Sequence, residues 1–76
     1  MEEKLLGLLN VVLHNNGLKR LERLDHETHL RNDLELDSIN LAELTVRVED
    51  EFGIDLFEDG IVDTVGQIIE KIKSDK

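Results

Sequence analysis

Apolar residues recur at the spacing of an α-helix in three separate stretches of this 76-residue chain. The last stretch is the most regular, because its apolar residues stand at positions i, i+3, i+4 and i+7, on one face of a helix. They are Val65, Ile68, Ile69 and Ile72. Thr64 and Gln67 have the spacing of a capping box, which marks a helix start. No stretch alternates apolar and polar residues for long enough to make a sheet, so the pattern predicts an all-α fold.

The same spacing predicts two further helices. The first covers residues 2–15 and ends at Asn15-Asn16-Gly17, because glycine adopts the left-handed conformation that a helix end requires. The second begins near Ser38 and ends at Phe52-Gly53, again with glycine just beyond the last turn. Its apolar stripe, which we expect to face the core, consists of Leu41, Leu44, Val48 and Phe52.

Residues 18–37 form a long connection between the first two helices. Loops beyond about 12–15 residues are uncommon in compact domains and are usually functional. This one contains several leucines, so we expect either that it is held against the helices or that an extra short helix covers residues 18–24. The leucines are Leu18, Leu21, Leu24, Leu30, Leu34 and Leu36. Farther along, residues 56–62 have room for at most a short helical turn.

These elements predict a small four-helix bundle with three main helices, one short third helix and a long loop between the first two. The chain contains no proline, low-complexity tract or internal repeat, so we expect residues 1–76 to form a single domain. A chain of this length buries only about 60% of the surface of its unfolded form, so its core is small.

Acidic residues are concentrated in the middle of the sequence. Residues 32–63 contain eleven acidic residues and one basic residue, Arg47, a net charge of −10, whereas the whole chain has a net charge of −9. Such a segment either serves solubility alone or provides a docking surface for a basic partner. It argues against a nucleic-acid partner, which binds a basic face.

Composition disfavours several other classes of function. The chain has no cysteine, which excludes disulfides and cysteine-based metal or catalytic sites. Its longest apolar run is too short to cross a bilayer, and the start at Glu2 and Glu3 is unlike a signal peptide, so we expect a cytoplasmic monomer with no membrane insertion. His26 and His29 lack a third ligand, so no metal site is expected. No signature of an organised base accompanies Ser38, so we do not expect an enzyme.

The face of the second helix opposite its core stripe carries two apolar residues, Ile39 and Val46, where water is expected. Acidic residues also occupy the last turn, where the helix dipole is negative and each acid costs on the order of 0.3–1 kcal/mol at low salt. Isolated surface apolar residues are common, but an apolar pair surrounded by acids suits a partner-docking surface. The charged residues of this candidate surface are Glu43, Arg47, Glu49 and Asp50.

Asp37 and Ser38 stand where the second helix begins. Taken alone, this dipeptide is a typical helix cap. A serine hydroxyl at a helix N-terminus is also a suitable site for a phosphate ester, because free backbone N–H groups and the helix dipole favour negative charge there. Ser38 is therefore a candidate both for a cap and for phosphoryl attachment.

Several runs of residues surround this dipeptide in a familiar order: Asp33-Leu34-Glu35-Leu36-Asp37-Ser38-Ile39, Glu43-Leu44, and Glu49-Asp50-Glu51-Phe52-Gly53-Ile54. They resemble the acyl carrier proteins, whose usual pattern is D-L-G-L-D-S-L followed by a helix that ends E-E-E-F. The resemblance extends to Leu24-Asp25-x-Glu27-Thr28-x-Leu30 in the long connection and to Thr64-Val65-Gly66 at the last helix. It covers nearly the whole chain.

The resemblance implies that Ser38, with Asp37 as its motif neighbour, receives a 4′-phosphopantetheine arm from coenzyme A. A phosphopantetheinyl transferase performs this step in the family, and the thiol of the arm then carries an acyl group as a thioester. The carrier moves that group between acyl-transferring or condensing enzymes of fatty acid, polyketide or related pathways. The resemblance also implies that basic patches on these enzymes dock on the second helix, at Glu43, Val46, Asp50 and their neighbours.

Three positions differ from the family pattern. Glu35 replaces the usual glycine, Arg47 replaces a small residue, and Phe57 replaces a proline. The segment from Leu56 to Val65 is also about two residues shorter than usual. These differences favour a specialised carrier over the standard fatty-acid carrier. The alternative function from a different class is an unmodified acidic helical adaptor, in which Ser38 serves only as a cap.

Overall fold

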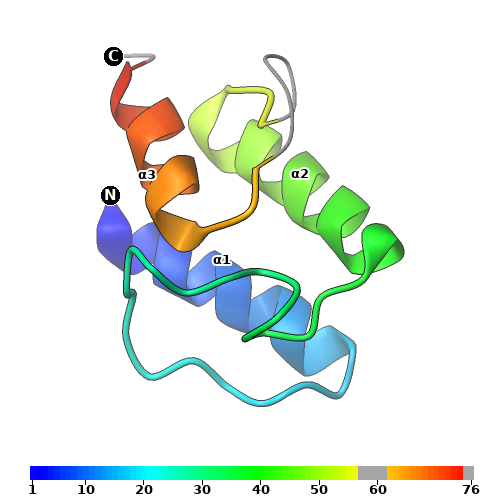
Figure 1. Ribbon diagram of the computed structural model, residues 1–76. Helices are drawn as coiled ribbons and strands as arrows, with labels where there is room; N and C mark the ends of the chain where they lie inside the picture. Colours follow the sequence, from blue (N-terminus) through cyan, green and yellow to red (C-terminus); the bar gives the residue numbers. More distant parts are fainter. Residues whose placement is uncertain (57–61, 75–76) are drawn as a thin grey trace.

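The computed structural model describes residues 1–56 and 62–74, and this part of the chain contains three helices (Figure 1). They are α1 at Glu2–Asn15, α2 at Ser38–Phe52 and α3 at Val65–Ser74. These bounds confirm the three main helices and the all-α class. Most of the predicted short turn at residues 56–62, including Phe57, lies outside the described residues. Within the described residues, β-type pairing is confined to an isolated bridge between His29 and Thr64.

Glycines end the first two helices as the sequence predicts. Gly17 has a φ of 68°, and two backbone bonds close the end of α1: Gly17 N–H donates to the His14 carbonyl at 3.1 Å, and Leu18 N–H donates to the Leu13 carbonyl at 2.8 Å. This pair of bonds is a Schellman motif. Gly53 has a φ of 71°, and its N–H donates to the Glu49 carbonyl at 2.8 Å. A residue with a side chain would be strained at either position.

Each helix contributes one apolar face to a common core. The predicted stripe of α3 is fully buried, and three of the four predicted residues of α2 are buried, with Phe52 half-buried against them. Asn40 is the one polar residue buried with them among those described. The buried hydrophobic residues of the helices are Leu5, Leu9, Val12, Leu13, Leu41, Leu44, Val48, Val65, Ile68, Ile69 and Ile72.

The long segment between α1 and α2 first runs back along α1 (Figure 1). Asn10 on α1 fixes it through two bonds to one residue: its side-chain oxygen accepts from Leu21 N–H at 2.7 Å, and its side-chain nitrogen donates to the Leu21 carbonyl at 3.0 Å. No helix forms over residues 18–24, so the alternative of an extra short helix there is wrong. The Leu21 backbone bonds to a side chain of α1 instead of to its own neighbours.

The segment then reaches the start of α3 before it returns to α2. Val65 N–H donates to the Thr28 carbonyl at 3.0 Å, and Leu30 N–H donates to the Asp63 carbonyl at 2.8 Å. Three of its leucines, Leu30, Leu34 and Leu36, are buried in the core, and the other three are half-buried against it. The expectation that this connection is held against the helices is therefore confirmed.

The start of α3 has the predicted capping box. Gln67 N–H donates to Thr64 Oγ1 at 3.2 Å, and Thr64 N–H donates to Gln67 Oε1 at 3.0 Å. This reciprocal pair satisfies donors that the first turn of a helix otherwise leaves unpaired. Of the helices in the described residues, none is both long enough and apolar enough to cross a membrane.

Candidate attachment and docking site

Asp37, and not Ser38, is the N-cap of α2. Asp37 has an extended backbone (φ −95°, ψ −174°), and its carboxylate accepts a hydrogen bond from Asn40 N–H at 2.8 Å. In return, Asn40 Oδ1 accepts from Asp37 N–H at 3.2 Å, which completes a capping box. Ser38 is the first residue inside the helix. The Asp37-Ser38 dipeptide therefore does cap the helix, but only its aspartate does so.

The Ser38 side chain is exposed and is not used to hold the helix together. Its hydroxyl oxygen accepts a hydrogen bond from Arg31 Nη2 at 3.3 Å. The hypothesis that Ser38 serves only as a cap is wrong, because the Asp37 carboxylate already satisfies the N–H group that a serine cap would satisfy. The hydroxyl is thus available for substitution without loss of the cap.

A turn closed by hydrogen bonds at His29 leads into α2. The His29 carbonyl accepts from Asp33 N–H at 3.0 Å and from Leu34 N–H at 3.1 Å, and His29 N–H donates to the Asp33 carboxylate at 2.7 Å. Leu34 and Leu36 are both buried, whereas Glu35 between them is exposed. Glu35 has a φ of 62°, the left-handed region that disfavours a side chain.

The outer face of α2 exposes the two apolar residues that the sequence placed there. Ile39 is 79% exposed and Val46 is 65% exposed. They are seven residues apart, so they lie on the same side of the helix, about two turns from each other. Glu49, Asp50 and Glu51 in the last turn are exposed as well, and no basic residue of α2 accompanies them there. The exposed part of α2 therefore carries an apolar pair along its length and acids in its last turn.

Glu43 makes contacts within the molecule as well as facing water. Its carboxylate accepts from Arg47 Nε at 3.1 Å, from Asn16 Nδ2 at 3.2 Å and from Asn15 Nδ2 at 3.4 Å. The hydrogen bond from Asn16, and after it the one from Arg47, lowers the pKa of Glu43 from its ordinary value. Glu43 thus links the first half of α2 to the C-terminal end of α1.

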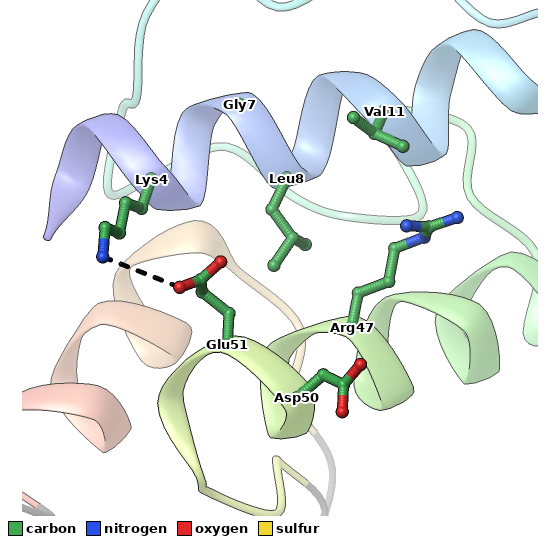
Figure 2. A pocket seen from close by; sticks show the side chains of 7 residues that line it. All are labelled: Lys4, Gly7, Leu8, Val11, Arg47, Asp50 and Glu51. Atoms are coloured by element: carbon green, nitrogen blue, oxygen red, sulfur yellow. Dashed lines mark ion pairs between the residues drawn. The ribbon is translucent and has the colours of Figure 1, made fainter.

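A groove of about 390 Å³ separates α1 from the second half of α2. Figure 2 shows Leu8 of α1 pointing into it and the long side chain of Arg47 reaching from α2 toward Val11. Lys4 and Glu51 meet at the other end, where Lys4 Nζ lies 3.7 Å from a Glu51 carboxylate oxygen. The remaining lining residues are Gly7 and Asp50. Arg47 and Asp50 therefore lie on the side of the outer face that borders α1.

Sequence reasoning missed two sets of residues that contact the candidate site. Arg31 stands seven positions before Ser38 and directly precedes the acidic segment, but nothing in the sequence pattern connected it with Ser38. Asn15 and Asn16 were considered only as part of the helix end, yet both donate to Glu43. His26 and His29 belong to no group of three or more metal-ligating side chains in the part of the chain that the structure describes.

Comparison with protein families gives a match over most of the chain. Residues 3–72 match the family described as "Phosphopantetheine attachment site". The match includes α2, the long connection and all but the ends of α1 and α3. It therefore covers Ser38 and all residues of the candidate docking surface.

The curated relatives are similar over nearly the same span. A protein named acyl carrier protein from Lactobacillus acidophilus is 32% identical over 75 residues, which is 96% of this chain and 94% of the relative. One of the same name from Coprothermobacter proteolyticus is 31% identical over 74 residues, 95% of this chain and 90% of the relative. A third, from Lactobacillus johnsonii, is 36% identical over 55 residues, 70% of this chain and 69% of the relative. No solved structure gives a significant match.

Proposed function

This chain belongs to the acyl carrier protein family, and from that premise we propose that Ser38 is the residue that bears its 4′-phosphopantetheine group. Members of this family are carriers without catalytic activity of their own. When bound, the group supplies a terminal thiol that holds an acyl chain as a thioester. The protein thus presents acyl groups to the enzymes of fatty acid or related biosynthesis.

The exposed hydroxyl of Ser38, which takes no part in capping the helix, is the observation on which this assignment rests. It is exposed at the first position of α2, and the cap of that helix is made by Asp37 and Asn40. Esterification of the Ser38 oxygen therefore removes no bond that holds the helix start. The first N–H groups of a helix and the positive end of its dipole favour a phosphate at this position.

We further propose that the outer face of α2 docks the enzymes that act on this carrier. The phosphopantetheinyl transferase and the acyl-handling enzymes must all approach Ser38, and Ile39 lies directly beside it. The exposed apolar pair gives a partner a surface to bury, and the surrounding acids attract a basic patch. The proposed docking residues are Ile39, Glu43, Val46, Arg47, Glu49 and Asp50.

Intact mass spectrometry tests the assignment of Ser38. The purified protein is incubated with a phosphopantetheinyl transferase, coenzyme A and Mg²⁺, and a gain of one phosphopantetheine group is expected. The matched control is Ser38→Ala, which keeps the Asp37 cap and is expected to gain nothing. No mass gain on the unaltered protein, or an equal gain on Ser38→Ala, would contradict the proposal and favour an unmodified acidic adaptor.

A further inference from the structure

Arg31 is held beside the proposed attachment residue by the turn that precedes α2. Its neighbour Leu30 is buried, with 1% of its surface exposed, and Leu30 takes part in two backbone hydrogen bonds. Leu30 N–H donates to the Asp63 carbonyl at 2.8 Å, and its carbonyl accepts from Leu36 N–H at 3.0 Å. The backbone at Arg31 is therefore tied both to the start of α3 and to the residues that lead into Ser38.

The guanidinium group of Arg31 has donors to spare. Its contact within the described residues is the 3.3 Å hydrogen bond from Nη2 to Ser38 Oγ, and no carboxylate there forms an ion pair with it. Of the three acids between Arg31 and Ser38, Asp33 accepts from His29 N–H and Asp37 caps α2. The third, Glu35, is exposed and forms no ion pair with Arg31 among the described residues. A guanidinium has five N–H donors in a planar fork that matches the oxygens of a phosphate.

Attachment at Ser38 changes the group that the Arg31 guanidinium contacts. The oxygen that now accepts from Arg31 becomes the ester oxygen of a phosphodiester, which adds one negative charge and two further acceptor oxygens. Residues 32–63 already carry a net charge of −10, so the added charge is repelled by most of its surroundings. Arg31 is the cation that the structure places in hydrogen-bond contact with the attachment oxygen.

We propose that Arg31 is a positioning residue that binds the phosphate of the 4′-phosphopantetheine group and fixes the base of the arm against the turn before α2. This inference depends on the proposed attachment at Ser38. Its physical basis is that, after loading, the Arg31 cation faces an anionic phosphodiester instead of a neutral hydroxyl, so that it can pair with the charged non-bridging oxygens as well. In the unloaded protein, the same contact orients the Ser38 hydroxyl.

Comparison of unloaded and loaded protein provides the test, with loading verified by intact mass. Melting temperatures are measured for both forms of the unaltered protein, of Arg31→Gln and of Arg31→Lys. The matched control is Arg23→Gln, which removes the same charge from an exposed residue of the same connection that has no bond to Ser38. The ¹⁵N and ¹H signals of the arginine side chains and the ³¹P signal of the phosphodiester are recorded in parallel.

Loading should raise the melting temperature more, or lower it less, in the unaltered protein than in Arg31→Gln. The two changes should differ by roughly 1–5 °C at low salt. Arg23→Gln should respond to loading as the unaltered protein does, and Arg31→Lys should keep part of the difference because it retains the charge without the fork. The difference should shrink in 1 M salt, which screens exposed charge pairs. The Arg31 side-chain signals should shift on loading, and the ³¹P signal should differ between loaded Arg31→Gln and the loaded unaltered protein.

Equal effects of loading in the unaltered protein and Arg31→Gln, together with unchanged Arg31 signals, would overturn the inference. If Arg31→Gln cannot be loaded, the test depends on the Arg31 side-chain signals of the unaltered protein. A shift of these signals on loading supports phosphate binding by Arg31, and no shift overturns it. Failure of the unaltered protein to gain mass at Ser38 contradicts the attachment proposal instead. The two failures are thus distinguishable in one set of samples.

Discussion

Gly66, at the start of α3, lies directly against the backbone of His26 in the long connection. Gly66 N–H donates to the His26 carbonyl at 3.0 Å, and a Cβ built on Gly66 would lie 2.8 Å from that same carbonyl oxygen. Real Cβ atoms essentially never approach an oxygen so closely, and the oxygen belongs to the backbone, so it cannot swing aside. The absence of a side chain at Gly66 therefore allows the connection to dock on α3.

Gly66→Ala is expected to lower the free energy of unfolding by about 1–3 kcal/mol, the usual cost of an overpacked contact. Either the His26–Gly66 bond lengthens or the connection moves away from α3. Chemical denaturation measures the loss. Gly7→Ala is the matched control, because Gly7 is an exposed residue inside α1 with nothing within 4 Å of an added Cβ. It should raise stability by about 0.5–1 kcal/mol through helix propensity. Similar changes in both variants would contradict the close contact at His26.

Glu35 is expected to be a source of strain that glycine would relieve. Its φ of 62° costs a residue with a side chain about 1 kcal/mol, and the burial of Leu34 and Leu36 on either side holds it in that conformation. Glu35→Gly should therefore raise the free energy of unfolding by up to about 1 kcal/mol, measured by denaturation. Glu35→Gln separates the two causes, because it removes the charge and keeps the side chain. A gain in Glu35→Gln equal to that in Glu35→Gly would assign the effect to charge repulsion.

Apolar spacing predicted most of the fold because each helix turns a single apolar face to the core. The pattern Val65, Ile68, Ile69, Ile72 specified α3, and the exposure of Ile39 and Val46 followed from the same geometry applied to α2. The path of the long connection could not be predicted this way. It depends on single contacts between residues far apart in sequence, such as Asn10 with Leu21, which leave no periodic signal.

The candidate site was predicted at the level of residues but not of their roles. The dipeptide Asp37-Ser38 was compatible with a cap made by either residue, and only the hydrogen bond from Asn40 N–H to the Asp37 carboxylate decides which one caps. The contact of Arg31 with Ser38 depends on the turn around Leu30, which brings together residues seven apart outside any helix. Outside helices and strands, no fixed spacing in the sequence predicts which residue a charged side chain will contact.

Glu43 is expected to make stability depend on pH in the acid range. Its folded-state pKa is lower than its ordinary value of 4.5, first because of the hydrogen bond from Asn16 and then because of the one from Arg47. A group with a lowered folded pKa stabilises the protein above its unfolded pKa, and that stabilisation is lost as the pH falls through the folded pKa. Glu43→Gln should therefore be less stable than the unaltered protein at pH 7, and the difference should shrink as the pH falls below about 4.5.

The measurement is a series of denaturation curves between pH 7 and pH 3 for both proteins. Glu22→Gln is the control, since Glu22 is exposed in the long connection and makes no hydrogen bond or ion pair among the described residues. It should track the unaltered protein across the series. A constant difference between Glu43→Gln and the unaltered protein at all pH values would mean that the carboxylate charge plays no part in the contacts with α1.

Asp50 offers the clearest separation of docking from folding. Asp50 is exposed, lies in the last turn of α2 and forms no hydrogen bond or ion pair within the described residues. Asp50→Lys should therefore keep or slightly raise stability, because a cation suits the C-terminal end of a helix. It should weaken binding to a phosphopantetheinyl transferase about 2- to 30-fold at low salt, since a favourable charge pair becomes a repulsive one. Calorimetric titration measures the affinity, and Glu22→Lys, at an exposed residue of the long connection outside the proposed docking residues, should leave it unchanged.

Glu43→Lys and Ile39→Ala complete the test of the docking face. Glu43→Lys should weaken binding too, but it should also lower stability, because it breaks the contacts with Asn16 and Arg47. Ile39→Ala should weaken binding by an amount that salt does not change, since Ile39 is 79% exposed and contributes apolar area. The salt dependence of the affinity should therefore be smaller in Asp50→Lys and Glu43→Lys than in the unaltered protein, and unchanged in Ile39→Ala. Normal affinity in both Asp50→Lys and Ile39→Ala would mean that partners reach Ser38 from another side of the molecule.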